Sequence, residues 1–236
     1  MIDKQIVNMG KTSLIQLNPV TISRMLEIAP NAFLLSFPRS FEFEAGQVIG
    51  VGLSKFDDAR IYSIASGTKE DQIDILFDIK AEGYLTPKLA SFKAGDTLFV
   101  SEPFGSFHGS ENTAWWIASG TGIAPYRSML RSGFGGGKWV IHGSRTEASF
   151  YFADEFSNAF GHHYVRCLSQ KNIPSDAMPD KQIFKGRVTQ FLETFDILQK
   201  ELQYFLCGSA EMVIECRELL LEKKVPYGNI MAEVYF

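Results

Sequence analysis

Arg60 and Tyr62 are residue types that together can hold a flat ligand carrying a phosphate. They lie in Arg60–Ser66, which follows a turn-rich stretch and alternates polar with apolar residues, so we expect a β-strand. Side chains two positions apart on a strand share a face. There a guanidinium can bind a phosphate while a phenol ring stacks on a planar group. An ordinary exposed strand with a surface arginine is the alternative, and this segment alone leaves both open.

Gly83–Thr86 is a second candidate anion site, with Tyr84 and Leu85 inside the turn. It directly follows a strand-like segment. Thr86 suits an N-cap and Pro87 suits the first helical position, so a short helix is expected to begin here. The free N–H groups of a helix start attract anions. A simple strand-to-helix turn is the alternative.

Gly120, Thr121 and Gly122 form a third candidate site. They follow the short apolar run Trp115–Ala118 and precede a helical stretch. This order of strand, glycine-rich turn and helix lets backbone amides approach a pyrophosphate. Pro125 stands where the dinucleotide fingerprint would carry a third glycine. The segment therefore indicates a dinucleotide site with a departure from the usual pattern.

Arg145 bears on which dinucleotide is bound. In a dinucleotide-binding fold, an acidic residue about 20 positions after the glycines holds a ribose hydroxyl and marks NAD. The next strand ends here in His142–Arg145 without an acid. A guanidinium at that place suits a 2′-phosphate, which favours NADP. Arg187 is a candidate for a second phosphate ligand, and a solvated surface arginine is the alternative for each.

The elements that must position these residues differ between the two parts of the chain. Up to about Ser101 the segments are short, strand-like and separated by turns, which predicts an antiparallel barrel or sandwich. After Gly109–Asn112 strands alternate with helices, which predicts a parallel, doubly wound sheet. We therefore predict two domains, residues 1–110 and 111–236. The expected strands are Leu14–Leu17, Ala32–Phe37, Gln47–Val51, Ile73–Ile79, Thr97–Val100, Trp115–Ala118, Lys138–His142, His163–Cys167 and Tyr204–Cys207, and the expected later helices are Ser149–Ala159 and Ala210–Lys223.

Composition excludes several classes of protein. The formal net charge of −4 gives no broad basic surface, so we expect no nucleic-acid partner. No apolar run is long enough to cross a bilayer, and Met1–Gln5 does not resemble a secretion signal. The three cysteines and four histidines show no metal-ligand spacing, so we expect no metal and no disulfide framework. These features predict a cytoplasmic protein without a membrane partner. We also expect a monomer or weak dimer.

Taken together, five segments resemble motifs of the ferredoxin/flavodoxin–NADP⁺ reductase family, most closely those of its short bacterial members. Each motif is modest alone, but five in the right order are specific. The segments are Arg60–Ser63 (Arg-x-Tyr-Ser), Gly83–Thr86 (the second FAD motif), Gly120–Pro125 (the nicotinamide loop), Cys207–Met212 (Cys-Gly-x-x-x-Met) and Ala232–Phe236 (a terminal Glu-x-Tyr with one extra aromatic residue).

The resemblance implies an antiparallel FAD-binding barrel followed by an NADP(H)-binding α/β domain. It implies that Tyr62 stacks on one face of the flavin ring and Tyr235 covers the other. Ser63 would hydrogen-bond near flavin N5, Cys207 would lie near nicotinamide C4, and Glu233 would support proton movement. The other cofactor-binding residues implied are Arg60, Ile61, Gly83, Tyr84, Leu85, Thr86, Gly120, Thr121, Gly122, Pro125, Arg145, Ser169, Arg187, Gly208, Met212 and Phe236.

One departure concerns the 2′-phosphate. Family members often carry Ser-Arg where this chain has Ser169 and Gln170, which removes one candidate phosphate ligand. Lys171 and Arg166 are the residues that can compensate.

The implied function is electron transfer between NADP(H) and ferredoxin or flavodoxin through FAD, by hydride transfer between nicotinamide C4 and flavin N5. Two alternatives stay open: an NAD(P)H-dependent free-flavin or quinone reductase, and an electron-transfer subunit of a larger complex. An acidic carrier protein needs a local basic surface on its reductase. Lys88, Arg127 and Arg131 are the candidates for that surface.

Overall fold

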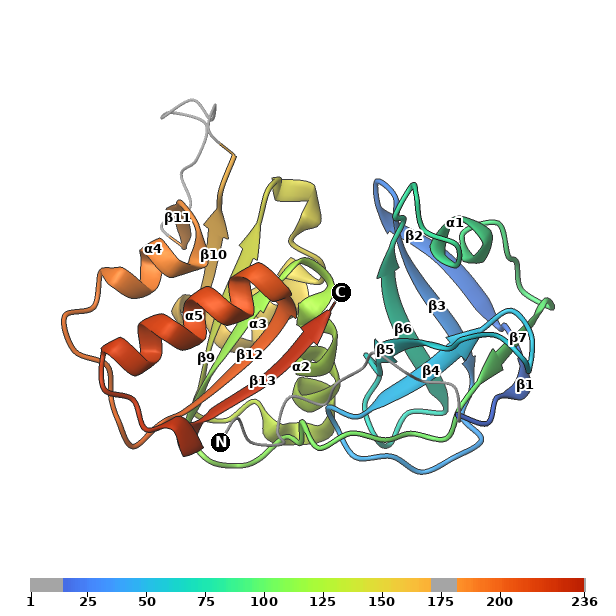
Figure 1. Ribbon diagram of the computed structural model, residues 1–236, viewed down its shortest axis with the longest axis horizontal. Coiled ribbons are helices and arrows are strands. Elements are labelled where there is room, and N and C mark those ends of the chain that lie inside the picture. The colour runs from blue at the N-terminus through green and yellow to red at the C-terminus, as the bar shows by residue number, and fades with distance from the viewer. Residues whose placement is uncertain (1–14, 171–181, 236) are drawn as a thin grey trace. The chain divides into compact units, whose positions relative to one another are not determined.

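The computed structural model describes residues 15–170 and 182–235, and the chain divides into two compact units, Met1–His108 and Gly109–Phe236 (Figure 1). Among the described residues, no helix has the length and apolar character needed to cross a membrane.

The first unit is built from antiparallel strands. One sheet has the order β1-β7-β4-β5 and the other has the order β2-β3-β6. An isolated bridge between Ile64 and Ile75 connects the chain just after β5 to β6, so the two sheets form one barrel-like body. This confirms the predicted antiparallel domain. Its elements are β1 (Asn18–Thr21), β2 (Arg24–Ala29), β3 (Ala32–Pro38), β4 (Val48–Gly52), β5 (Arg60–Ser63), β6 (Gln72–Asp78), α1 (Thr86–Leu89) and β7 (Thr97–Val100).

Strand β6 contributes most of its length to the core of this unit. Ile73, Ile75 and Phe77 alternate along it, as the sequence predicts for one apolar face. The opposite face is covered too, because Asp74 is only 3% exposed. Its carboxylate accepts a hydrogen bond from the Ser36 hydroxyl at 2.6 Å and lies 3.9 Å from the guanidinium of Arg24. A buried acid is tolerated here because its Oδ1 atom has a hydrogen-bond donor and a nearby cation.

The second unit is a six-stranded parallel sheet of order β11-β10-β9-β8-β12-β13. In Figure 1, α4 and α5 lie on the near face of this sheet and α2 and α3 on the far face. This confirms the predicted doubly wound arrangement. Its elements are β8 (Ala114–Ser119), a 3₁₀ turn (Gly120–Ile123), α2 (Ala124–Met129), β9 (Lys138–Ser144), α3 (Ala153–Phe160), β10 (Tyr164–Leu168), β11 (Ile183–Lys185), α4 (Val188–Glu193), β12 (Gln203–Ser209), α5 (Ala210–Glu222) and β13 (Ile230–Tyr235).

Two adjacent tryptophans on β8 show why both faces of this sheet must be covered. Trp115 contacts Phe195 and Tyr204, with ring centroids 5.2 and 5.7 Å away. Trp116 stacks on Tyr126 of α2 at 5.4 Å, on the opposite face. Successive side chains of a strand alternate in direction, so each tryptophan needs its own layer of helices.

Several element predictions were wrong. The described part of the expected first strand, residues 15–17, is not a strand, and β1 begins only at Asn18. The helix expected from Ser149 begins instead at Ala153, because Phe152 has a left-handed backbone with φ of 59°. A left-handed residue cannot continue a right-handed helix. The strands β2, β11 and β13 were not predicted.

Candidate dinucleotide-binding site

The glycine turn after β8 depends on two glycines for different reasons. Gly120 has φ of +53°, and a Cβ built on it would meet nothing within 4 Å. Its outer side is therefore open to a ligand. A Cβ on Gly122 would lie 2.2 Å from the carbonyl oxygen of Cys207 and 2.7 Å from Cα of Gly208. Only glycine lets the turn pass this close to the end of β12.

Ser119 and Gly208 hold the ends of β8 and β12 together. Gly208 has φ of +146°, and a Cβ there would lie 2.2 Å from the Ser119 hydroxyl oxygen. The backbone N–H of Ser209 donates to that oxygen at 3.0 Å. Ser119 begins the segment Ser119–Pro125 that the sequence indicates as a phosphate cradle, but its packing against Gly208 was not predicted. Met212, predicted to bind cofactor, is 8% exposed and belongs to the core of this unit.

Two residues predicted to be catalytic lie side by side although they are 26 positions apart. Cys207 on β12 and Glu233 on β13 are partners in the parallel register. The Cys207 thiol is 4.0 Å from the Glu233 Oε2 atom, and the two residues are 0% and 8% exposed. Farther along β13, the backbone of Tyr235 pairs with that of Ser209. The side chain of Tyr235, and all of Phe236, lie outside the described residues.

His142 on β9 contacts the backbone of the glycine turn, and the sequence did not indicate this role. Its Nε2 atom is 3.2 Å from the Gly120 carbonyl oxygen and its Nδ1 atom is 3.1 Å from the Tyr164 hydroxyl. A carbonyl only accepts, so Nε2 carries the proton and Tyr164 donates to Nδ1. Burial, assisted by the charge of Arg166, lowers the pKa of His142 from 6.5 to about 4, although the bond to Gly120 opposes the shift. The ring is therefore neutral at neutral pH.

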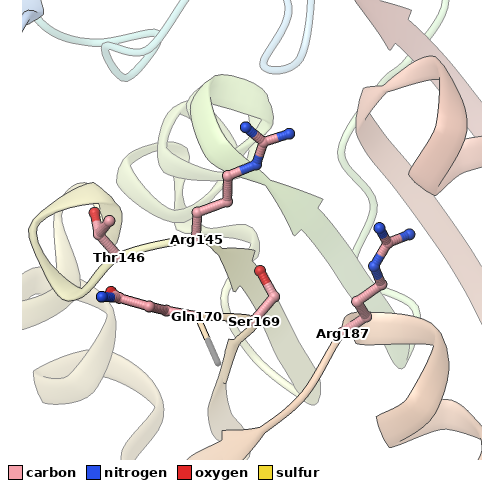
Figure 2. Close-up of a pocket in the computed structure, with 5 residues that line it drawn as sticks. All are labelled: Arg145, Thr146, Ser169, Gln170 and Arg187. Atoms are coloured by element: carbon pink, nitrogen blue, oxygen red, sulfur yellow. The ribbon is translucent and has the colours of Figure 1, made fainter. Parts of the chain in front are cut away.

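The residues expected near a 2′-phosphate come together around one pocket. It has a volume of about 450 Å³ and is lined by the ends of β9 and β10 and the start of α4. Figure 2 shows the side chains of Arg145 and Arg187 extending to the same side, with Ser169 between them. Ser169 is fixed by donating to the Ser144 carbonyl at 3.1 Å. The lining residues are Arg145, Thr146, Ser169, Gln170 and Arg187.

The two residues expected to compensate for Gln170 do not both bear on this pocket. Arg166 is not among its lining residues, and its guanidinium lies 5.9 Å from the ring of Phe150. Lys171 lies outside the described residues.

In the first unit, Arg60, Tyr62 and Ser63 share the short strand β5. Arg60 is exposed, Ile61 and Tyr62 are half-buried, and Ser63 is buried at 2% exposure. Burial raises the pKa of Tyr62 well above 10, and the charge of Asp78 adds to this while Arg60 opposes it. Tyr62 is thus a neutral phenol at any ordinary pH, packed on one side against the core.

The Gly83–Thr86 turn has a different cap from the predicted one. Thr86 is the first residue of α1 rather than its N-cap, which is Leu85. The Thr86 hydroxyl accepts instead from the Lys80 N–H at 2.9 Å, and this bond closes the preceding turn. Leu85 is buried in the core at 5% exposure. Tyr84 is 61% exposed, with the Lys88 ammonium 3.7 Å from its ring centroid.

The expectation that Arg127 contributes to a basic surface for a carrier protein is wrong. Its side chain is 6% exposed, and its Nε atom is 2.9 Å from Glu155 Oε2. Arg131 pairs with the other oxygen of the same carboxylate at 2.6 Å. Burial acts to raise the pKa of Glu155, but the two guanidinium groups outweigh it and lower that pKa overall. Arg127 therefore forms a buried ion pair inside this unit and does not contribute to an exposed basic surface.

Known proteins resemble the chain over most of its length. Residues 116–218 match the family described as the oxidoreductase NAD-binding domain. Ferredoxin–NADP reductase B of Sorangium cellulosum (strain So ce56) is 32% identical over 235 residues, covering 88% of this chain and 93% of that protein. The phenol 2-monooxygenase reductase component DmpP of Pseudomonas sp. (strain CF600) is 24% identical, and the alignment covers 91% of this chain but only 64% of that relative.

A solved structure supports the same fold. A ferredoxin NADP⁺ reductase from Neisseria gonorrhoeae, with FAD and NADP bound, superposes with a TM-score of 0.81 at 21% identity, covering 94% of this chain and 99% of that one. The identity to the Sorangium protein extends over nearly all of both chains. The chain belongs to the ferredoxin–NADP reductase family.

Proposed function

We propose that this chain is an FAD-dependent oxidoreductase that moves electrons between NADP(H) and a one-electron carrier protein, ferredoxin or flavodoxin. The observation that carries this is the glycine turn at Gly120–Gly122 pressed against Cys207, whose thiol lies 4.0 Å from the Glu233 carboxylate. A backbone open on one side, a buried thiol and a buried carboxylate suit the binding and orientation of a nicotinamide.

The residues of the second unit fit NADP(H). The open side of Gly120 leaves room for a pyrophosphate to approach the backbone. The pocket with Arg145, Ser169 and Arg187 supplies two cations and a hydroxyl for a 2′-phosphate. Thr121 lies in the turn, Pro125 lies in the first turn of α2 that follows it, and Gly208 keeps β12 close to the glycine turn.

The residues of the first unit fit FAD. Arg60 offers an exposed cation for the phosphates, and Tyr62 offers a ring held on one side by the core. Ser63 adds a buried hydroxyl on the same strand, and the Gly83–Thr86 turn adds backbone groups. In this proposal Tyr235 covers the second face of the flavin and Phe236 packs on its adenine side, as the family resemblance implies.

Bound FAD would supply the step from a two-electron to a one-electron donor, which no protein side chain performs. The chain supplies position and a dry surrounding. The glycine turn sets the nicotinamide's depth, buried Cys207 keeps water from its reactive edge, and Glu233 holds a carboxylate ready to exchange a proton.

A second candidate is the reductase component of an oxygenase, and the similarity to DmpP favours it. The two candidates share the nicotinamide and flavin steps and differ in the acceptor. A comparison of ferredoxin, flavodoxin, free flavin and quinone as acceptors separates them and also tests the remaining alternative.

The deciding experiment is stopped-flow reduction of the purified yellow protein by NADPH and by NADH, followed by addition of ferredoxin or flavodoxin. We expect bleaching of the flavin band by NADPH in preference to NADH and reoxidation by one of the carriers. A colourless protein that does not take up FAD, or a flavin that neither nucleotide bleaches, would overturn the proposal.

A further inference from the structure

Arg187 already has an anionic partner. Its Nη1 atom lies 2.8 Å from Glu211 Oε1 and 3.8 Å from Glu215 Oε1. The hydrogen bond and charge of Glu211, followed by the charge of Glu215, raise the pKa of Arg187 above its ordinary value. Arg145, by contrast, makes no ion pair with any residue in 15–170 or 182–235. A phosphate that binds Arg187 must therefore compete with a carboxylate, whereas one that binds Arg145 does not compete with any carboxylate of the described residues.

The position of the two acids follows from the fold. Gly208 and Ser209 end β12 at the glycine turn, and α5 starts at once with Ala210. Glu211 is thus in the first helical turn, where the helix dipole favours a negative side chain. Glu215 is four positions later and shares its face. Both side chains project toward the start of α4, where Arg187 is located.

The charges around the pocket bear on which nucleotide it binds. The five residues lining the pocket carry two positive charges, from Arg145 and Arg187, and Gln170 adds none. Glu211 and Glu215 bring two negative charges to the Arg187 side of the pocket, and these offset the charge of Arg187. A 2′-phosphate brings close to two negative charges and must take Arg187 from a carboxylate that already holds it. A ribose hydroxyl carries no charge and faces no such competition.

We propose that Glu211 is a specificity-determining residue that weakens the preference for NADP(H) over NAD(H) by competing with the 2′-phosphate for Arg187. This inference rests on the proposed function, because it assumes a nicotinamide dinucleotide in this pocket. Glu215 contributes less because its carboxylate lies farther away. Glu211 thereby acts in the same direction as Gln170, which occupies the place of a third cation.

The test compares two nucleotides that lack a nicotinamide, adenosine 2′,5′-bisphosphate and 5′-AMP, by isothermal titration calorimetry on the FAD-loaded 236-residue chain. The measured quantity is the ratio of their dissociation constants. We expect Glu211→Gln to raise the preference for the bisphosphate about 1.4- to fivefold, the range for removing an exposed charge contact. Arg187→Ala should lower the preference by about tenfold.

The matched control is Glu222→Gln, the same change at the end of α5, about 16 Å along the helix axis from Glu211. It should leave the ratio unchanged. In the double variant Arg187→Ala/Glu211→Gln, the second change should have no further effect.

An unchanged ratio in Glu211→Gln overturns the inference, and so does an equal rise in the Glu222→Gln protein or in the Arg187→Ala background. An unchanged ratio in Arg187→Ala also overturns it, because Arg187 would then not contact the phosphate. Each of these results leaves the proposed function intact if NADPH still bleaches the flavin. Failure of the wild-type chain to bind either nucleotide overturns both.

Discussion

Gly122 lies where a single methyl group would meet the main chain of another strand. In Gly122→Ala the added carbon would be 2.2 Å from the Cys207 carbonyl oxygen, and neither backbone can withdraw without breaking its sheet or turn. We expect this variant to lose about 1–3 kcal/mol of unfolding free energy. We also expect its KM for NADPH to rise at least about tenfold, because the turn no longer fits its ligand.

Gly136→Ala is the control for this change, since a Cβ at Gly136 meets nothing within 4 Å. Thermal unfolding and steady-state kinetics measure the two effects. Equal behaviour of the two alanine variants would contradict the assigned role of Gly122.

The lowered pKa of His142 predicts a contribution to stability that is lost at acid pH. Its pKa is about 4 in the folded chain against 6.5 ordinarily, so between these values the unfolded state binds a proton that the folded state does not. The contribution is intact above pH 6.5 and is lost as the pH falls to about 4. The size is about 3 kcal/mol, from 1.36 kcal/mol per pKa unit.

His142→Gln keeps a donor near the Gly120 carbonyl but cannot titrate. We therefore expect the difference in unfolding free energy between wild type and this variant to shift by about 3 kcal/mol from pH 7 to pH 4. Urea denaturation at several pH values measures this difference, in which acids shared by both proteins cancel. Parallel pH curves for the two proteins would show that the imidazole does not titrate as stated.

At the scale of elements, the regular patterns were predictable and the irregular ones were not. Strand β7 was predicted with its observed bounds, because a short apolar segment between turns has one interpretation. Strand β2 was missed because its register shifts between Glu27 and Ala29, which breaks the two-residue alternation. Strand β11 has only three residues, and β13 was interpreted as a tail motif rather than as an element.

The site divides in the same way. Glycine and arginine motifs have fixed spacing along the chain, so Gly120, Gly122 and Arg145 could be named as candidates from the sequence. Partners joined only by strand order were not visible: Ser119 meets Gly208 because β8 and β12 are neighbours in the sheet, although 89 positions separate the two residues. The pairing of Arg187 with Glu211 likewise depends on how α4 and α5 pack.

Asp74 is the buried acid of strand β6, and we expect its removal to lower the free energy of unfolding markedly. Asp74→Ala leaves the Ser36 hydroxyl without its acceptor in a site that is 3% exposed. We expect a loss of about 2–3 kcal/mol in unfolding free energy. Asp71→Ala, one residue before the strand and exposed, should change it by less than about 0.5 kcal/mol. Urea unfolding followed by circular dichroism compares them, and similar losses would remove the special role of Asp74.

At the scale of the whole molecule, each unit has a hydrophobic core of its own. The chain is therefore not required to unfold in a single step. Because the proposed FAD ligands Arg60, Tyr62 and Ser63 belong to the first unit, removal of FAD should lower the transition of that unit most. A ligand at a hundred times its Kd stabilises by about 2.7 kcal/mol.

Differential scanning calorimetry with and without FAD checks this expectation. Two transitions, one of which moves up with added FAD, are the expected outcome. A profile that FAD does not change would argue against a flavin site in the first unit.

The close approach of Gly122 to the Cys207 carbonyl also has a practical consequence for protein engineering. The glycine turn and the segment Cys207–Ser209 pack closely against each other at Gly122, Gly208 and Ser119. A graft that brings in a foreign nucleotide loop alone would clash with a strand end shaped for the original. An engineered exchange should therefore transfer the glycine turn and the segment Cys207–Ser209 together.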